Sequence, residues 1–292
     1  MDQKSILIIG ANGQLGKALR AQYPGAKAVD MAELDISDRE QLDAFNWNGI
    51  KTILNAAGYT NVDGAETAEG RVAAWKANAA AVSNVACKCQ QNGMTLVHIS
   101  TDYVFDGTKT PHIEDEPLSP LSVYGASKAA GDIAVSTVPK HYILRTSWVI
   151  GDGKNFVRAM LELGKKGVNP SVVSDQIGRL TFTTELVRAI DHLIAHSSQL
   201  TAKGVQAPYG SYNISNDGKP ASWANITREI FRQASLNNTV TDITSAEYYK
   251  NKPEAATRPL NSTLDLSKIQ AVGFEPRDWQ TDLKTYVAKE LD

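Results

Sequence analysis

A short apolar run followed at once by three evenly spaced glycines constrains this sequence more than any other feature. Residues 5–9 have the composition of a strand buried on both faces of a parallel sheet, and residues 14–22 have the apolar spacing of a helix. Between them lie Gly10, Gly13 and Gly16, at GxxGxxG spacing. Glycines permit a tight turn and a close approach of the backbone, and the free N–H groups at a helix start attract phosphate. The pattern therefore predicts a strand–turn–helix unit that binds a dinucleotide.

Strands and helices continue to alternate after this turn. We expect them, in turn, over residues 26–30, 38–45, 51–55, 65–92, 95–99, 122–138 and 141–145. This alternation predicts an α/β fold, namely a Rossmann-like doubly wound parallel sheet. The rhythm then loosens, so residues 1–147 are expected to form an NAD(P)-binding domain, with part of 170–215 returning to it. Residues 148–292 are expected to form mainly a smaller, interleaved α/β domain for the substrate.

The composition excludes several classes of protein. Hydrophobic residues make up 42% and charged residues 21% of the 292 residues, which is usual for a globular enzyme and not for a disordered chain. The net charge of -2 provides no basic surplus for nucleic acid, and no apolar run approaches the ~20 residues of a membrane span. Cys87 and Cys89 are too few for a disulfide framework. We therefore expect a cytoplasmic protein with a small-molecule partner and with neither nucleic acid nor membrane as a partner.

Residues that follow the next expected strands suit the remainder of a dinucleotide. Asp30 ends the second strand, where a carboxylate accepts hydrogen bonds from a free ribose 2′-hydroxyl and repels a 2′-phosphate, which favours NAD. Asp35 and Ile36 could reach the adenine, or could equally be the polar and core residues that lead into a helix. The small residues 56–58 would let a flat ligand lie against the backbone, although a tight turn also explains them.

A hydroxyl, a tyrosine and a lysine together form the candidate chemistry. Tyr124 and Lys128 stand at i, i+4 and therefore share one face of the expected helix. Tyrosine titrates near ~10, so exchanging a proton near neutrality requires a lowering worth roughly 3–4 kcal/mol, which a neighbouring ammonium can supply. Thr101 lies at the carboxyl end of an expected strand, where its hydroxyl can hydrogen-bond a substrate carbonyl oxygen. In this order, after a glycine turn, the three residues predict a site that reduces carbonyl groups.

Several motifs, taken together, identify a family resemblance. They are GANGQLG at 10–16, NAAGYTNVD at 55–63, STDYVFDG at 100–107, YGASK at 124–128, SDQIG at 174–178 and RPLNS at 258–262. The sequence resembles the extended short-chain dehydrogenase/reductases and, within them, the family of dTDP-4-dehydrorhamnose reductases of the RmlD type. The resemblance covers nearly the whole chain, and STDYVF is its most specific part.

The resemblance implies a reaction and a role for each catalytic residue. The nicotinamide of NADPH or NADH would deliver a hydride to C4 of dTDP-4-dehydro-6-deoxy-L-mannose, and the product would be dTDP-L-rhamnose. Tyr124 would protonate the oxygen, Lys128 would lower the tyrosine pKa and bind the nicotinamide ribose, and Thr101 would hold the keto oxygen. The family often prefers NADPH or accepts both cofactors, whereas Asp30 argues against a 2′-phosphate.

The resemblance and the motifs also give two sets of binding residues. Cofactor contacts are expected from Gly10, Asn12, Gly13, Gln14, Leu15, Gly16, Asp30, Asp35, Ile36, Ala56, Ala57, Gly58, Tyr59, Ser100, Tyr124 and Lys128. Substrate contacts are expected from Val62, Thr101, Asp102, Tyr103, Trp148, Arg179 and Arg258. Trp148 is equally explained as a core tryptophan, and the two arginines either pair with the diphosphate or form surface salt bridges.

Other functions stay open at this point. A nucleotide-sugar 4,6-dehydratase of this superfamily has Thr-Asp-Glu at the active strand, and here Tyr103 follows Thr101 and Asp102, so the extra acid is missing. Another nucleotide-sugar 4-ketoreductase or an epimerase would use much the same motifs. The regulatory beta subunit of methionine adenosyltransferase also resembles this family and is a binding partner, not a catalyst.

Three further expectations concern metals, assembly and an acidic run. No metal ligands are predicted, since His192 and His196 share a helix face without a third ligand. Some relatives bind Mg²⁺ at a dimer interface, which makes Mg²⁺ and a homodimer implications of the resemblance, although the sequence does not place the ligands. The acidic residues 114–116 are expected to form a solvated loop or, alternatively, part of a lid over the sugar site.

Overall fold

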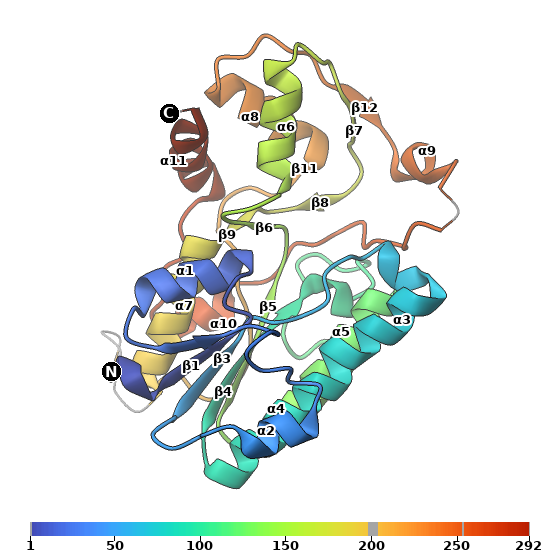
Figure 1. Cartoon of the computed structure of the whole chain (residues 1–292). Helices are drawn as coiled ribbons and strands as arrows, with labels where there is room; N and C mark the ends of the chain where they lie inside the picture. Colours follow the sequence, from blue (N-terminus) through green and yellow to red (C-terminus); the bar gives the residue numbers. More distant parts are fainter. Residues whose placement is uncertain (1, 198–203, 253, 292) are drawn as a thin grey trace.

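A computed structural model describes residues 2–197, 204–252 and 254–291, and its centre is a six-stranded sheet (Figure 1). The strand order is β10-β5-β4-β3-β1-β2, and every neighbouring pair runs parallel. The expected doubly wound α/β fold is therefore confirmed, and the carboxyl ends of the strands meet at one edge. The strands are β1 (Ile6–Ile9), β2 (Lys27–Val29), β3 (Thr52–Asn55), β4 (Thr95–Thr101), β5 (His141–Thr146) and β10 (Gly210–Asn213).

Helices cover both faces of this sheet, because successive residues of a strand point to opposite sides. Ile6 and Ile8 of β1 belong to the core on one face, and Leu7 and Ile9 belong to the core on the other. The first face carries α1 (Gln14–Gln22), α7 (Thr183–His196) and the short α10 (Ser267–Ala271). The second carries α2 (Arg39–Ala44), α4 (Ala81–Asn92) and α5 (Val123–Ser136).

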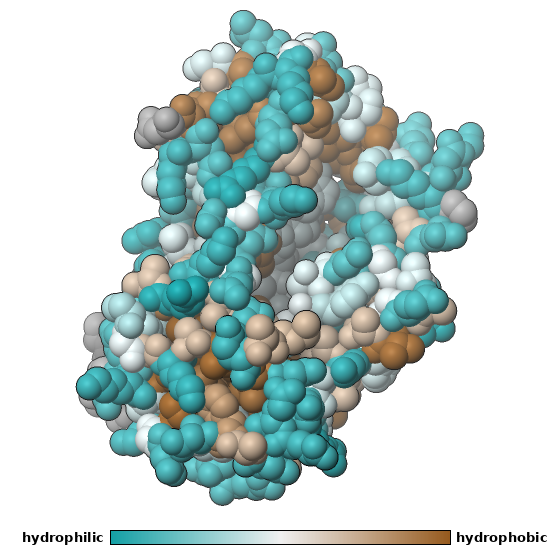
Figure 2. All heavy atoms as spheres, viewed as in Figure 1, coloured by the Kyte–Doolittle hydropathy of each residue, from teal (hydrophilic) through white to brown (hydrophobic). Residues whose placement is uncertain are grey.

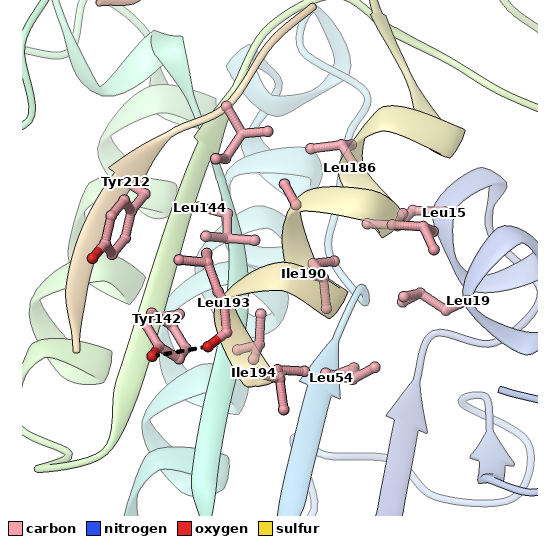
Figure 3. Close-up of a cluster of buried hydrophobic side chains, with 14 of the residues drawn as sticks. Leu15, Leu19, Leu54, Tyr142, Leu144, Leu186, Ile190, Leu193, Ile194 and Tyr212 are labelled. Atoms are coloured by element: carbon pink, nitrogen blue, oxygen red, sulfur yellow. Dashed lines mark hydrogen bonds between the residues drawn. The ribbon is translucent and has the colours of Figure 1, made fainter. Parts of the chain in front are cut away.

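The core on the first face joins helices from distant parts of the sequence (Figure 3). Leu15 and Leu19 of α1 lie beside Leu186 and Ile190 of α7, above the strands. The hydroxyl of the fully buried Tyr142, on β5, donates a hydrogen bond of 3.2 Å to the carbonyl of Leu193 near the end of α7. Because α7 and β10 come from the second half of the chain, this packing supports our proposed division, in which part of 170–215 belongs to the cofactor domain.

Residues beyond β5 build a second lobe past the carboxyl edge of the sheet (Figure 1). Its core gathers side chains of α6 (Phe156–Lys165), α8 (Trp223–Gln233) and α11 (Trp279–Leu291). Two-stranded ladders brace it: β6 (Val149–Ile150) with β9 (Thr181–Phe182), β7 (Ser171–Val173) with β12 (Thr241–Ile243), and β8 (Ile177–Gly178) with β11 (Ala221–Ser222). The helix α9 (Ser245–Tyr249) follows β12. Within the described ranges, every helix is too short or too polar to cross a bilayer.

The helix expected over residues 65–92 is interrupted. It consists of a 3-10 turn, η2 (Gly64–Glu66), then α3 (Ala68–Trp75), a π-helical turn, η3 (Lys76–Ala80), and α4. The π turn contains Asn78, which is fully buried and hydrogen-bonds the backbone of Tyr59. The alanine-rich sequence favours one helix, and a tertiary contact changes its winding in the middle.

The turn between β1 and α1 depends on two of its three glycines. Gly10 has a positive φ of 80°, and a Cβ there would lie 2.6 Å from the Ala57 nitrogen, so no other residue allows this approach. A Cβ on Gly16 would lie 2.0 Å from the Gly10 carbonyl oxygen, whereas one on Gly13 would lie 3.5 Å from it, an ordinary contact. Gly16 therefore holds α1 against the turn, while the backbone at Gly13 faces open space.

Replacing Gly16 tests this account of the turn. Gly16→Ala should lower the free energy of unfolding by about 2 kcal/mol, because the new methyl group forces α1 away from the Gly10 carbonyl. Gly13→Ala is the matched control and should change it by less than ~1 kcal/mol. Urea denaturation without cofactor measures both, and equal stabilities of the two variants would refute the close-packing argument.

Candidate active site

Two adjoining cavities run along the carboxyl edge of the sheet, where Figure 2 shows the surface hollowed between the lobes. The first, of about 460 Å³, is lined by the glycine turn, residues 30–37 and the π turn. The second, of about 420 Å³, is lined by the ends of β3, β4 and β5, the start of α5 and Trp148. Gly13 and residues 56–59 line both cavities, so a long, bent ligand could occupy the two together.

The expected cofactor residues around the first cavity also support one another. The Asp30 carboxylate accepts hydrogen bonds from the backbone N–H groups of Asn12 (2.8 Å) and Met31 (2.8 Å), and so ties the glycine turn to the end of β2. Asp35 and Ile36 line this cavity, yet each also has a structural contact. The Asp35 carboxylate accepts from Ser37, which lowers its pKa, and Ile36 packs in the core.

Gln14 and Leu15 line the second cavity from the start of α1. The Gln14 Oε1 accepts a hydrogen bond of 2.9 Å from the backbone of Gly151, which joins α1 to the second lobe, and Leu15 is part of the first core. Ser100 lies beside Thr101 on β4, is buried, and lines the same cavity.

The three expected catalytic residues line the second cavity together. Thr101 ends β4, and Tyr124 and Lys128 lie on α5, which packs against β4 and the turn that follows it. A Cβ at Gly125 would lie 2.2 Å from the Tyr103 carbonyl oxygen, so this glycine sets how closely α5 approaches. The Lys128 Nζ donates a hydrogen bond of 2.5 Å to the carbonyl of Ile99.

Burial dominates the titration of these groups. It raises the pKa of the Tyr124 hydroxyl, an effect that a hydrogen bond with Thr101 partly offsets and the carboxyls of Asp102 and Asp132 reinforce. It lowers the pKa of Lys128 to about 8, against the opposing influence of Asp132. The lowering of the tyrosine pKa expected from Lys128 is therefore not seen within the chain itself. A phenol with a raised pKa is protonated at neutral pH, which is the form that a proton donor needs.

Asn78 is a residue that the sequence reasoning missed. Its amide accepts from the Tyr59 nitrogen (2.8 Å) and donates to the Tyr59 oxygen (3.0 Å) and to the Ser127 hydroxyl (3.0 Å). The Ser127 hydroxyl in turn donates to the carbonyl of Tyr124 (2.7 Å). This chain of bonds connects the cofactor side of the cavity to the catalytic helix. Nothing in the local pattern signals it, because each contact joins segments far apart in the sequence.

Most of the expected substrate residues line the second cavity. Val62, Asp102, Tyr103 and Trp148 all line it, and the ring of Tyr103 lies edge-on to Tyr124 with centroids 5.6 Å apart. The indole of Trp148 also stacks on Trp223 with centroids 3.7 Å apart, as expected of a core tryptophan, and its contact with a substrate stays a prediction. It has a positive φ of 48°, which is unusual for a bulky residue and typical of strained functional positions.

Comparison with known proteins decides the family. The profile of the RmlD substrate binding domain matches residues 4–291. The chain belongs to the RmlD family. The dTDP-4-dehydrorhamnose reductase of Aggregatibacter actinomycetemcomitans is 39% identical, covering 96% of this chain and 97% of that protein.

Solved structures of RmlD relatives have the same fold over nearly their whole length. A dTDP-4-dehydrorhamnose reductase from Clostridium acetobutylicum superposes with a TM-score of 0.88 at 35% identity, over 98% of this chain and 99% of that one. The enzyme from Bacillus anthracis, solved in complex with NADP, gives a TM-score of 0.86 at 34% identity, over 98% of both chains. The expected resemblance is thereby confirmed.

The two arginines expected to contact the diphosphate, Arg179 and Arg258, do not line either cavity. Arg258 forms a two-point ion pair with Asp63, with N–O distances of 2.8 and 2.9 Å, and its guanidinium lies 5.1 Å from the ring centroid of Tyr249. Arg179 donates to the carbonyl of Leu264 at 3.3 Å. The ion-pair alternative therefore describes Arg258 here, and contact of either arginine with a diphosphate stays a prediction.

The acidic run at 114–116 is not the solvated loop that the sequence favours. Glu114 and Glu116 are both buried. The Glu114 carboxylate accepts from the Asn213 nitrogen at 2.9 Å, and the Glu116 carboxylate pairs with His112 at 2.9 Å. Neither residue lines the two cavities, so the lid interpretation finds no support either. Among the described residues, no group of three or more His, Cys, Asp or Glu side chains could hold a metal ion, so the Mg²⁺ expectation gains no support.

Asp102 gives a pH-dependent test of this site. Burial raises its pKa from 3.8 to about 6, despite hydrogen bonds from Ser262 and Thr101 that lower it. Between these values the folded protein binds more protons than the unfolded chain, so the carboxyl's contribution to stability falls as the pH rises and is lost above 6.

Asp102→Asn removes this titration while keeping the shape of the side chain. The free energy of unfolding of the wild type, relative to the variant, should fall by about 2.4 kcal/mol between pH 4 and pH 8. Urea denaturation at a series of pH values measures the difference. Parallel curves for the two proteins would contradict a raised Asp102 pKa.

Proposed function

We propose that this protein reduces the C4 keto group of dTDP-4-dehydro-6-deoxy-L-mannose with NAD(P)H, giving dTDP-L-rhamnose. The observation that carries the proposal is that Thr101, Tyr124 and Lys128 line one cavity, which adjoins a second cavity built on the glycine turn. Relatives over the full length of the chain are named dTDP-4-dehydrorhamnose reductases, which supports the choice of substrate.

The residues of the first cavity fit a dinucleotide. The turn at Gly13 offers backbone N–H groups at the start of α1, where a pyrophosphate is stabilised. Residues 56–58 present little side chain toward the space that continues to Lys128. Bound along this edge, NAD(P)H would supply the hydride, and a close structural neighbour was solved with NADP.

Proton transfer is the part of the reaction that the chain's own residues perform. In the structure the Thr101 hydroxyl donates to the Asp102 carboxylate at 3.0 Å. As negative charge develops on the keto oxygen, this hydroxyl can turn to donate to it, and Tyr124 can transfer its proton. Burial keeps that proton on the phenol until the oxygen becomes basic enough to take it. Lys128, held at the Ile99 carbonyl, is positioned to bind the nicotinamide ribose and to support the phenolate that remains.

The substrate would lie between the lobes. Trp148 and Tyr103 provide flat apolar surfaces for the sugar or base, and Asp102 provides an acceptor beside Thr101. A diphosphate would compete with Asp63 for Arg258, since a guanidinium binds phosphate in the same two-point manner as a carboxylate. The homodimer implied by the resemblance and the cytoplasmic location expected from the composition stay predictions.

Changing Tyr124 tests the proposed proton donor. Tyr124→Phe should lower kcat by about 10²–10⁴-fold while the fold is kept, because only the hydroxyl is removed. The assay is the loss of reduced nicotinamide absorbance with dTDP-4-dehydro-6-deoxyglucose and its 3,5-epimerase. Tyr23→Phe is the control, since the Tyr23 hydroxyl contacts Asp191 at a site remote from both cavities.

Two outcomes of this assay would overturn the proposal. A near-normal rate in Tyr124→Phe would remove the residue from its role. No oxidation at all by folded wild-type protein that still binds the cofactor would favour another nucleotide sugar or a regulatory subunit. If the reduced nicotinamide is oxidised without the epimerase, the assigned substrate is wrong in its stereochemistry.

Changing Asp30 tests the choice of cofactor. We expect Asp30 to favour NADH, and Asp30→Asn should raise kcat/KM for NADPH relative to NADH by about tenfold or more, because a carboxylate next to a 2′-phosphate is repulsive. The asparagine oxygen can still accept a hydrogen bond from the Asn12 nitrogen. Asp43→Asn makes the same change of charge at an exposed surface pair and should leave the ratio unaltered. An unchanged ratio in Asp30→Asn would reject the interpretation of Asp30.

A further inference from the structure

His98 is a buried histidine that the proposed reaction does not use. It lies on β4, three residues before Thr101, and is fully buried. Its ring stands between two polar side chains, with Nδ1 3.2 Å from the Asn55 Nδ2 and Nε2 3.5 Å from the Lys128 Nζ. A histidine in contact with the proposed catalytic lysine can influence the protonation of that lysine.

The hydrogen bonds of Asn55 determine which ring nitrogen of His98 carries the proton. The Asn55 Oδ1 accepts from the backbone nitrogen of Ala57 at 3.2 Å, so its NH₂ group faces the ring. An NH₂ group only donates, which requires the His98 Nδ1 to accept. A neutral imidazole then carries its single proton on Nε2, the nitrogen that faces Lys128.

This arrangement suits a neutral lysine and opposes a charged one. An ammonium has donors only, so it would meet the His98 Nε2–H donor to donor, whereas a neutral amine accepts from Nε2–H and still donates to the Ile99 carbonyl. The other titratable or charged side chains around Lys128 are Tyr124 and Asp132 on α5, and Arg145 on β5. Arg145 engages Asp132 at 3.1 Å, which leaves that carboxylate less available to a lysine ammonium.

We propose that His98 is a positioning residue whose Nε2–H favours the neutral amine form of Lys128, so that binding of NAD(P)H shifts Lys128 toward the ammonium and draws protons from solvent. The added proton bonds to the lone pair of Nζ, and the resulting ammonium turns from His98 toward acceptors of the cofactor. The negative phosphates of the dinucleotide favour this charged form. The reduction consumes one proton per turnover, and the site would take one up before the chemical step. The proposal rests on the proposed function only for the identity of the cofactor.

Proton uptake on cofactor binding tests this directly. Calorimetric titration of the full-length protein with NADH, and separately with NADPH, is run at pH 8 in buffers of different ionisation enthalpy. The wild type should take up roughly half a proton per cofactor, since the pKa of Lys128 is lowered to about 8.

Two substitutions separate the influence on Lys128 from mere packing. In His98→Gln a side-chain oxygen can face the ammonium, and in His98→Asn an acceptor is kept for Asn55 but nothing faces Lys128. Both should take up less than the wild type, because the donor that opposes the ammonium is gone, although burial still lowers the pKa of Lys128 in the variants. His141→Gln is the matched control, a histidine on the neighbouring strand whose ring contacts the Val138 carbonyl. It should show wild-type uptake.

Several results would overturn the proposal. Wild-type uptake in both His98 variants would do so, and wild-type uptake in His98→Asn alone would show that His98 only satisfies Asn55. If the variants do not fold, the ¹⁵N resonances of the His98 ring in the wild type decide, since a proton on Nδ1 contradicts the tautomer. Proton uptake on cofactor binding without reduction of the dTDP-sugar would contradict the proposed function but not this inference.

Discussion

Burial of charge at the carboxyl ends of β4 and β5 is the constraint on which the rest of the site depends. Lys128, Asp132 and Arg145 are each no more than 5% exposed, and an unpaired charge at such depth costs several kcal/mol. The surrounding structure compensates the charges of Asp132 and Arg145. Arg145 bonds Asp132 through Nε at 3.1 Å and the carbonyl of Glu114 through Nη1 at 2.7 Å. The bond to Glu114 thereby holds the acidic segment, residues 114–116, against the end of β5.

The parts of the site that could be predicted from the sequence are those set by local patterns, whereas contacts between distant segments could not be predicted. The glycine turn, the strand ends and the i, i+4 pair on α5 are local patterns, and the structure brings Thr101, Tyr124 and Lys128 into one cavity as expected. Local patterns do not predict the π turn at Asn78, because this turn depends on a hydrogen bond with the backbone of Tyr59, 19 residues away. They also place Glu114 on the surface, because an acidic run is normally solvated and only Arg145 and Asn213 make its burial favourable.

The two lobes contribute differently to the proposed chemistry. The sheet lobe supplies groups whose positions are fixed by backbone contacts, such as the Ile99 carbonyl at Lys128. The other lobe supplies surfaces that depend on side-chain packing, such as the stack of Trp148 on Trp223. Arg258 and Asp63 join the lobes across 195 residues of sequence, and this ion pair matches the salt-bridge alternative that the sequence left open for Arg258. Specificity for the sugar would then be adjusted in the second lobe without disturbing proton transfer in the first.

The place of β10 has a consequence for how the chain is made. This strand pairs with β5, yet α6 and α7 both lie between the two in the sequence. A ribosome that has released residues 1–147 has therefore produced a sheet with β5 as an open edge and with Tyr142 lacking its partner on α7. Open edges of this kind invite pairing with other chains. The sheet lobe therefore cannot be completed until β10 has been synthesised, and by then α6 of the other lobe has already been made.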